Sequence, residues 1–388
     1  MAVAVSLQPD DTSDQGHDAR ARALATFIGR VERKHGRGTV MRLGDAPSLD
    51  VDVIPTGILA LDLATGVCGI PRGRITEVYG DESSGKTSIA TLLIAQVQRQ
   101  GGTALMVDAE QAIDLAWCRR LGVDTDRLLL AQPSDAEEAL DVVEQAVASG
   151  AVDLVVLDSV AALAPVAEQQ ADIGEEVVAP GARLLNRSIR RMAHSIHTTR
   201  TAFVALNQLR MVIIPRPGMT YAPGCEGAHA KTTTPGGMGL KFAASLRIEL
   251  TRTQAIREGS TIIGNRIRVR VPKNKLAAPL ATCTVDLYYD RGPCVASSVV
   301  DMGLKTRVLC HEASAIRFGE VTLGRGRASA RDRLRTDPAL CARIAAAVRD
   351  AWTPTPSRDE SQGDAPPDGA RPSPTPALVQ LCIPGASD

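Results

Sequence analysis

The sequence is organised around the stretch Gly80-Asp81-Glu82-Ser83-Ser84-Gly85-Lys86-Thr87, which fits the pattern G-x-x-x-x-G-K-[ST]. An apolar run precedes it at residues 74–79, and a helix-like segment follows it. In that setting the two glycines let backbone N–H groups turn toward a phosphate chain, and the helix N-terminus adds partial positive charge. We therefore predict that all eight residues bind a nucleotide, with Lys86 on its β- and γ-phosphates and the Thr87 hydroxyl on Mg²⁺.

Short apolar runs alternate with helix-like segments on both sides of this loop. The runs cover residues 74–79, 103–107, 154–157 and 201–206. Strand, helix and strand in repetition predict an α/β fold with a mostly parallel sheet covered by helices on both faces. A later run, 266–271, alternates Arg with Ile or Val, which predicts a half-exposed strand with a basic outer face.

Changes in composition divide the chain into five parts. Residues 1–20 are predicted to be a disordered lead, and 21–47 to hold an amphipathic helix and an oligomerisation segment. Its own domain and a neighbouring subunit are both open as the surface on which that helix packs. The core is predicted to span 48–294, a small C-terminal α/β domain 295–352, and a disordered, Pro- and Ser-rich tail 353–388.

Composition limits the class of protein. The 44 basic and 44 acidic side chains cancel, so any nucleic-acid site must come from local clustering of charge. The eight cysteines form no CxxC pair, which is typical of reduced thiols in the cytoplasm. No apolar run approaches the roughly twenty residues that span a bilayer. We expect a soluble, cytoplasmic protein without a membrane partner.

Two carboxylates follow apolar runs at what should be the same edge of the sheet. Asp158 ends the run 154–157, where it would lie near the Mg²⁺ as a second metal ligand. Glu110 follows the run 103–107, where it could polarise the water that attacks the γ-phosphate. By the residues alone, Glu110 could equally be a solvated residue that starts the next helix.

With these motifs in this order and spacing, the chain resembles the bacterial RecA recombinase family. The resemblance rests on the phosphate loop, on DAEQAID at 108–114, DSVAAL at 158–163, Asn207-Gln208 and VPKNKLAAP at 271–279, and it extends to about Trp352. It implies a RecA-type ATPase core.

The resemblance assigns roles around the nucleotide. It implies that Glu110 is the catalytic glutamate and that Asp114 belongs to the nucleotide site. It also implies that Trp117 stacks on adenine, that Tyr289 is a second contact to the nucleotide ring, and that Gln208 senses the γ-phosphate.

Two lysines are assigned to a neighbouring subunit's site. The family likeness implies that Lys273 and Lys275 reach across an interface to the neighbour's ATP, so that hydrolysis needs a filament. Without it, two lysines after a strand would indicate a solvated edge.

The DNA-binding side is predicted from two loops and a helix. The loops would be 171–181 and 209–237, with Arg210 and Met211 opening the second and Gly236 and Gly237 closing it. Between the loops, four arginines fall at i, i+4, i+7 and i+8 of a helix and would share one face: Arg183, Arg187, Arg190 and Arg191. That face would contact DNA phosphates, or would simply be solvated.

Both loops depart from the family pattern. The second is about ten residues longer than usual and contains prolines at 215, 217, 223 and 235. The first contains Glu175-Glu176 and Pro180. Because proline fixes φ and removes a donor, we expect an altered geometry of strand exchange.

The sequence as a whole therefore predicts an ATP- and Mg²⁺-dependent recombinase that assembles into a helical filament on single-stranded DNA. It would pair that strand with double-stranded DNA in recombinational repair and the DNA-damage (SOS) response, and the resemblance adds self-cleavage of repressor-type proteins. Two alternatives stay open. One is a ring-forming motor ATPase with the same core; the other is a non-catalytic modulator of recombination, which would show no DNA-stimulated turnover.

Overall fold

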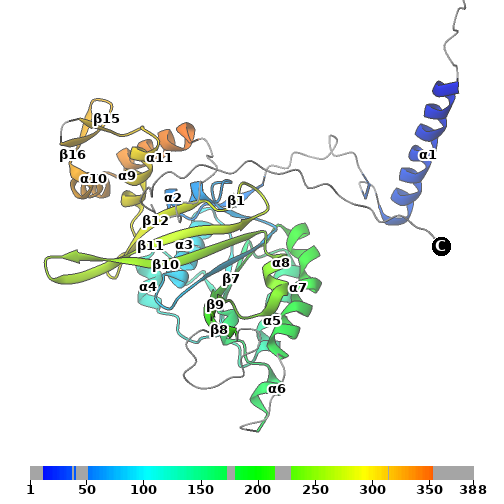
Figure 1. Ribbon diagram of the computed structural model, residues 1–388. Helices are drawn as coiled ribbons and strands as arrows, with labels where there is room; N and C mark the ends of the chain where they lie inside the picture. Colours follow the sequence, from blue (N-terminus) through cyan, green and yellow to red (C-terminus); the bar gives the residue numbers. More distant parts are fainter. Residues whose placement is uncertain are drawn as a thin grey trace, which may run out of the picture. The chain divides into compact units, whose positions relative to one another are not determined.

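The computed structural model describes residues 12–36, 39–40, 51–172, 180–214, 229–312 and 314–352. The chain divides into two units, 1–52 and 53–388. The described part of the first unit is mainly the helix α1, Thr12–His35 (Figure 1). It begins earlier than expected, so residues 12–20, predicted as disordered, are helical; they run directly into the Ala- and Arg-rich residues 19–25, which favour a helix. The remaining disorder predictions, for 1–11 and 353–388, lie outside the described residues.

A nine-stranded sheet forms the centre of the second unit, in the order β13-β12-β11-β10-β3-β7-β6-β4-β5. Six neighbouring strands pair in parallel: β10 (Leu246–Glu258), β3 (Ile75–Gly80), β7 (Ala202–Gln208), β6 (Leu154–Asp158), β4 (Ala104–Asp108) and β5 (Leu129–Ala131). Three strands continue the sheet in antiparallel fashion: β11 (Thr261–Asn274), β12 (Thr282–Tyr288) and β13 (Gly292–Pro293). The predicted α/β class with a mostly parallel sheet is confirmed.

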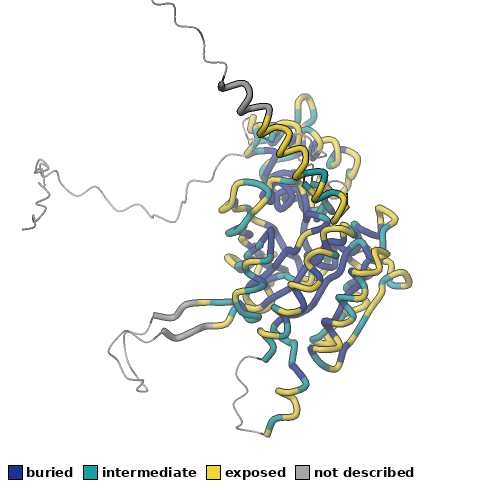
Figure 2. The backbone as a smooth tube through the Cα atoms, turned by 90° about the vertical axis from the view of Figure 1, so that its right-hand side faces the viewer, coloured by how far each residue is buried: buried dark blue, intermediate teal, exposed yellow. Residues whose placement is uncertain are grey.

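Successive side chains of the parallel strands point to opposite faces of the sheet, and both faces are apolar. Helices therefore cover both faces and form two apolar cores with them. On one face α3 (Lys86–Arg99) packs against strand residues such as Val78 and Met106. On the other, α5 (Ala136–Ser149), α7 (Pro180–Thr199) and α8 (Gly237–Ala243) pack against residues such as Leu105 and Phe203. The central strands are buried along their length (Figure 2).

The segment after β13 has a third apolar core. Its elements are α9 (Val295–Lys305), β14 (Cys310–Glu312), β15 (Ala315–Phe318), β16 (Val321–Arg325), α10 (Gly326–Thr336) and α11 (Pro338–Ala351). This core also includes residues of α2 (Leu59–Ala64) and of β12, and the backbone N–H of Ala60 donates to Ser298 Oγ at 2.7 Å. The segment therefore packs on the sheet-bearing part of the unit, and its boundary at 294/295 stays a prediction.

Short elements complete the described chain: β1 (Val53–Ile54), β2 (Ile70–Pro71), α4 (Leu115–Arg120), η2 (Val160–Ala162), α6 (Val166–Gln169), β8 (Arg210–Ile214) and β9 (His229–Thr233). Within the part of the chain that the structure describes, no helix is both long and apolar enough to cross a membrane.

Parallel pairing gathers the ends of four strands at one edge of the sheet. Gly80 at the end of β3 lies opposite Gln208 at the end of β7, and Asp108 at the end of β4 lies opposite Asp158 at the end of β6. Ligands of open α/β sheets bind outside the carboxyl ends of their strands. This edge is therefore where the fold places a site.

Candidate functional site

The loop between β3 and α3 depends on its second glycine. Gly85 has a φ of 89°, in the left-handed region, immediately before the first residue of α3. A Cβ on Gly85 would lie 2.8 Å from Leu287 Cδ2, so a side chain there would be both strained and crowded. Lys86 follows, and its Nζ donates to the backbone oxygens of Gly80 at 3.1 Å and Asp81 at 2.7 Å. The ammonium thus lies over the loop at the N-terminus of α3.

A cavity of about 420 Å³ opens beside this loop. Its lining is Glu82, Ser83, Ser84, Gly85, Lys86, Thr87, Ser88, Glu110, Trp117, Asp158, Gln208, Leu287, Tyr288 and Tyr289. Most of the predicted nucleotide-site residues therefore meet in one place. Gly80, Asp81 and Asp114 are outside this lining; the Asp114 carboxylate caps α4 by accepting from the Trp117 backbone N–H at 3.0 Å.

The first polar pair in the cavity joins the loop to β6. Thr87 Oγ1 donates to Asp158 Oδ2 at 2.8 Å. Burial raises the pKa of Asp158 to about 6; the Thr87 hydrogen bond lowers it, and the nearby Glu110 carboxylate raises it. A hydroxyl and a carboxylate oxygen in contact are ligands of the kind that Mg²⁺ prefers, so these two residues fit the predicted metal.

Glu110 is held by two hydrogen bonds, one from the residue that follows β6 and one from the last residue of β7. Its Oε1 accepts from Ser159 Oγ at 2.5 Å and from Gln208 Nε2 at 3.0 Å. The preceding residue is also fixed, because the Ala109 N–H donates to the Asp158 backbone oxygen at 2.7 Å. Ser159 was not predicted from the sequence, although its place directly after Asp158 was a usable signal.

Beneath Gln208 lies a buried polar network. Asn207 Nδ2 donates to Glu77 Oε1 at 2.9 Å and to the Pro235 backbone oxygen at 3.0 Å, and Glu77 Oε2 accepts from Arg247 Nε at 2.5 Å. Asn207 and Glu77 are fully buried. The chain just before α8 is thereby tied to the strand that carries Gln208.

Three aromatic residues also line the cavity: Trp117, Tyr288 and Tyr289. Trp117 Nε1 donates to Ser88 Oγ at 3.2 Å, and the Tyr289 hydroxyl accepts from Asn265 Nδ2 at 2.9 Å. Tyr289 is 55% exposed, whereas its neighbour Tyr288 is 2% exposed and lines the same cavity. Tyr288 was missed in the sequence, where the Tyr288-Tyr289 doublet at the end of a strand was the available signal.

Lys273 and Lys275 lie outside the cavity lining. Their Nζ atoms both donate to the Phe242 backbone oxygen, at 2.9 and 3.0 Å, near the C-terminal end of α8. Burial lowers the pKa of Lys273, and the charge of Lys275 lowers it further. The two cations thus form a pair at a helix end that attracts positive charge.

The predicted DNA-binding residues are partly described. Arg183, Arg187 and Arg190 are exposed on α7, and so is Arg191, whose Nη2 lies 3.0 Å from Glu144 Oε2 of α5. Most of the first loop, 173–179, and of the second, 215–228, lies outside the described residues, as does the Met211 side chain.

The described ends of the second loop are ordered by pairing and by glycines. Strands β8 and β9 pair in antiparallel fashion, and Arg210 Nη2 donates to the Ala161 oxygen at 3.5 Å. Gly236 and Gly237, with φ of 87° and 72°, begin α8. A Cβ on Gly236 would lie 2.8 Å from Leu185 Cδ2 of α7, so this turn requires glycine.

The phosphate loop, the carboxylates at adjacent strand ends and the order of the parallel strands define a P-loop nucleotide-binding protein. Comparison with known protein families assigns the chain to one family within that class. The model of the RecA N-terminal domain family matches residues 22–294. Protein RecA of Desulfovibrio desulfuricans is 44% identical over 331 residues, 85% of this chain and 88% of that protein. Protein RecA of Nitratidesulfovibrio vulgaris is 40% identical over 366 residues (94% and 98%), and that of Lactiplantibacillus pentosus 42% over 335 (86% and 86%).

The chain belongs to the RecA family. It is accordingly a DNA-dependent ATPase of homologous recombination and repair, it binds nucleotide and DNA, and it assembles with copies of itself.

Proposed function

We propose that the nucleotide is ATP and that it binds with Mg²⁺ in the cavity beside residues 80–87. Lys86 and the backbone of the loop would hold the phosphates, while Trp117 and Tyr289 would contact the base. Thr87 and Asp158 would hold the metal, which would neutralise charge on the phosphates when bound. The observation that carries this proposal is the convergence of a hydroxyl–carboxylate pair, Thr87 and Asp158, and a second carboxylate, Glu110, in one cavity.

Glu110 would act as the general base. A carboxylate can take a proton from the water that attacks the γ-phosphate, and the hydrogen bonds from Ser159 and Gln208 orient it. Gln208 would sense the γ-phosphate by exchanging its hydrogen bond to Glu110 for one to that phosphate. This exchange would release one acceptor site on Glu110 at the moment when the base is needed.

The signal would continue from Gln208 into the second loop, which begins at the next residue. Asn207 ties the end of that loop, through the Pro235 oxygen, to the same strand. Two ends fastened to one strand give a route by which a small movement at Gln208 shifts the loop.

Lys273 and Lys275 would complete the site of a neighbouring subunit in a helical filament. Neither lysine is among the lining residues of its own cavity, which supports a role in trans, and a developing γ-phosphate anion requires positive charge. Subunits outside a filament would then turn over ATP slowly.

The DNA would be single-stranded within the filament and double-stranded as the exchange partner. Arg183 and Arg190 on α7, with Arg210, Met211, Gly236 and Gly237 of the second loop, would contact it, the arginines through its phosphates. We further propose that the filament acts in the cytoplasm and promotes self-cleavage of repressor-type proteins, as the family likeness implies.

The deciding measurement is ATP turnover with and without single-stranded DNA, in the presence and absence of Mg²⁺. We expect strong stimulation by DNA and loss of turnover without the metal. A rate of ATP turnover that is the same with and without DNA would instead support a modulator of recombination or a ring-forming motor ATPase. Closed rings seen by electron microscopy, with DNA and a slowly hydrolysed ATP analogue, would contradict the filament.

A further inference from the structure

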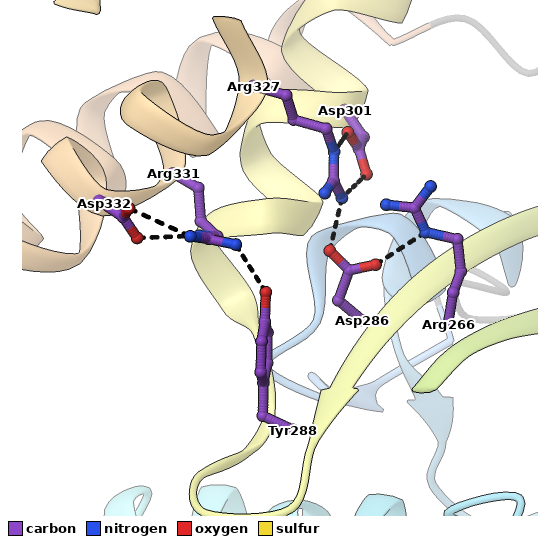
Figure 3. Close-up of polar contacts among 7 residues, drawn as sticks. All are labelled: Arg266, Asp286, Tyr288, Asp301, Arg327, Arg331 and Asp332. Atoms are coloured by element: carbon purple, nitrogen blue, oxygen red, sulfur yellow. Dashed lines mark hydrogen bonds and ion pairs between the residues drawn. The ribbon is translucent and has the colours of Figure 1, made fainter. Parts of the chain in front are cut away.

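Tyr288 joins the lining of the cavity to the C-terminal segment, 295–352. Its hydroxyl accepts a hydrogen bond of 2.7 Å from Nη1 of Arg331, which lies on α10 (Figure 3). The same guanidinium is fixed from its other side, because Nε and Nη2 donate to Asp332 at 2.9 and 3.1 Å. The donor that reaches Tyr288 is therefore already oriented by its own helix.

Helix α10 is anchored to the same strand at a second point. Arg327 donates to both oxygens of Asp301, at 2.6 and 2.7 Å, and to Asp286 Oδ2 at 2.7 Å. Asp286, which is 2% exposed, also accepts from Arg266 Nε at 2.9 Å. Burial raises the pKa of Asp286, but the hydrogen bonds from Arg266 and Arg327 outweigh it and leave the pKa lowered. Asp286 lies two residues before Tyr288, so one ion pair and one hydrogen bond, both from arginines, fasten α10 to the last three residues of β12.

The other neighbours of Tyr288 connect it to the predicted base-stacking residue. Tyr288 pairs with Gly292 across β12 and β13, and a Cβ on Gly292 would lie 3.5 Å from Trp117 Cζ2. The guanidinium of Arg291 lies 4.4 Å from the centre of the Tyr288 ring. Tyr288 and Trp117 thus belong to one wall of the cavity, and Trp117 also contacts the start of α3 through Ser88.

We propose that Arg331 is a positioning residue for the nucleotide base, acting through Tyr288, so that the C-terminal segment sets the nucleotide affinity of the core site. The inference rests on the proposed binding of ATP in this cavity. A tyrosine ring held by a fixed donor at its hydroxyl presents one orientation to the ligand. Without that donor the ring gains freedom, which base binding must then remove.

The test compares two ligands that differ in having a base. Binding of ADP and of inorganic pyrophosphate is measured by calorimetry on the full chain, for the parent and for Arg331→Met, which keeps a long apolar side chain without the donor. We expect about fivefold weaker ADP binding, roughly 1 kcal/mol, and unchanged pyrophosphate binding. Arg331→Lys, which keeps a cationic donor, should recover part of the loss.

A matched control and a second variant separate positioning from general damage. Arg333→Met, on the same helix and 3.8 Å from Asp337, should bind both ligands like the parent. Tyr288→Phe should weaken ADP binding as Arg331→Met does, and the double variant should lose no more than either single one.

Three results would overturn the inference. They are an ADP affinity of Arg331→Met equal to the parent's, an equal loss for ADP and pyrophosphate, and additive losses in the double variant. If the parent protein binds neither ligand, the proposed function is contradicted as well. If the parent binds ADP and Arg331→Met binds it equally well, only the role of Arg331 is contradicted.

Discussion

Gln208 and Glu110 are joined by a hydrogen bond of 3.0 Å, from Nε2 of the first to Oε1 of the second. The two residues are separated by 98 positions in the chain and come from the ends of β7 and the segment after β4. A residue proposed to sense the nucleotide thus contacts the residue proposed to act on water.

Replacing Gln208 should uncouple DNA binding from turnover. We expect Gln208→Ala to lower the ratio of DNA-stimulated to basal ATP hydrolysis by about tenfold, because the link between the γ-phosphate and the second loop is lost. The ratio is obtained from steady-state rates with and without single-stranded DNA. Gln145→Ala, at an exposed position on α5, is the control, and a ratio equal to the parent's would remove Gln208 from the coupling role.

Glu110→Gln should retain nucleotide binding and hydrolyse ATP at least about 100-fold more slowly, because the amide cannot accept the proton. The amide oxygen still accepts hydrogen bonds, so the geometry around Ser159 should survive. Binding is measured by calorimetry and turnover by phosphate release. Glu258→Gln, an exposed position, should behave as the parent does. Turnover of Glu110→Gln near the parent's rate would exclude the base role.

Mixing two inactive variants should restore activity if the lysines act in trans. Lys275→Met and Glu110→Gln, each slow alone, should regain about a quarter of the parent's turnover when mixed equally, since a quarter of random interfaces would join an intact Glu110 to an intact Lys275. A mixture of Glu110→Gln with the variant that carries both Glu110→Gln and Lys275→Met should show no recovery of turnover, because no subunit then has an intact Glu110. A mixture no faster than its components would place the lysines elsewhere in the mechanism.

If the exposed arginines of α7 contact DNA phosphates, their removal should weaken the dependence of DNA affinity on salt concentration. Arg183→Gln with Arg190→Gln should reduce the slope of log affinity against log salt concentration by about 1.4 for single-stranded DNA, if two phosphate contacts are lost. Arg343→Gln, an exposed position on α11 and outside this face, is the control and should leave the slope unchanged. An unchanged slope in the double variant would make this face merely solvated.

A buried carboxylate outside the cavity should make stability depend on pH. Asp62 Oδ1 accepts from the N–H and the hydroxyl of Thr56, and burial raises the pKa of Asp62 from 3.8 to about 6 despite these bonds. Because the folded state holds this proton more tightly, the free energy of unfolding falls as pH rises from about 4 to about 6.

Asp62→Asn keeps the acceptor oxygen and has no charge to bury. Its stability relative to the parent should therefore increase by roughly 1 kcal/mol between pH 5 and pH 7.5, as measured by urea unfolding. A difference between the two proteins that is the same at both pH values would show that Asp62 does not carry this dependence.

The local parts of the site could be predicted from the sequence, since a phosphate loop and a carboxylate at the end of an apolar run are set by consecutive residues. The runs at 74–79, 154–157 and 201–206 became β3, β6 and β7 with shifts of one or two residues. The basic run at 266–271 is also part of a strand, β11, with Ile267 and Val269 buried.

Contacts that depend on strand order could not be predicted in the same way. Ser159 reaches Glu110 because β6 lies beside β4, and no local pattern states that order. Tyr288 and Arg331 are 43 residues apart, and their contact depends on how the C-terminal segment packs against β12. The family resemblance pointed to the exposed Tyr289. The adjacent Tyr288 was a visible candidate, but the doublet alone does not state its contact with Arg331.

Asn207 has a consequence for how this protein could change over evolution. The segment that starts after Gln208 returns to the core at Pro235, whose oxygen is bonded to Asn207. Both ends of this segment are therefore attached to strand β7 or its neighbours. Lengthening a loop between two fixed ends adds little to the entropic cost of closing it. The second loop can therefore vary in length and sequence independently of the ATPase core. We expect that the loop of a relative can replace the residues between Gln208 and Pro235 while the core sequence stays unchanged.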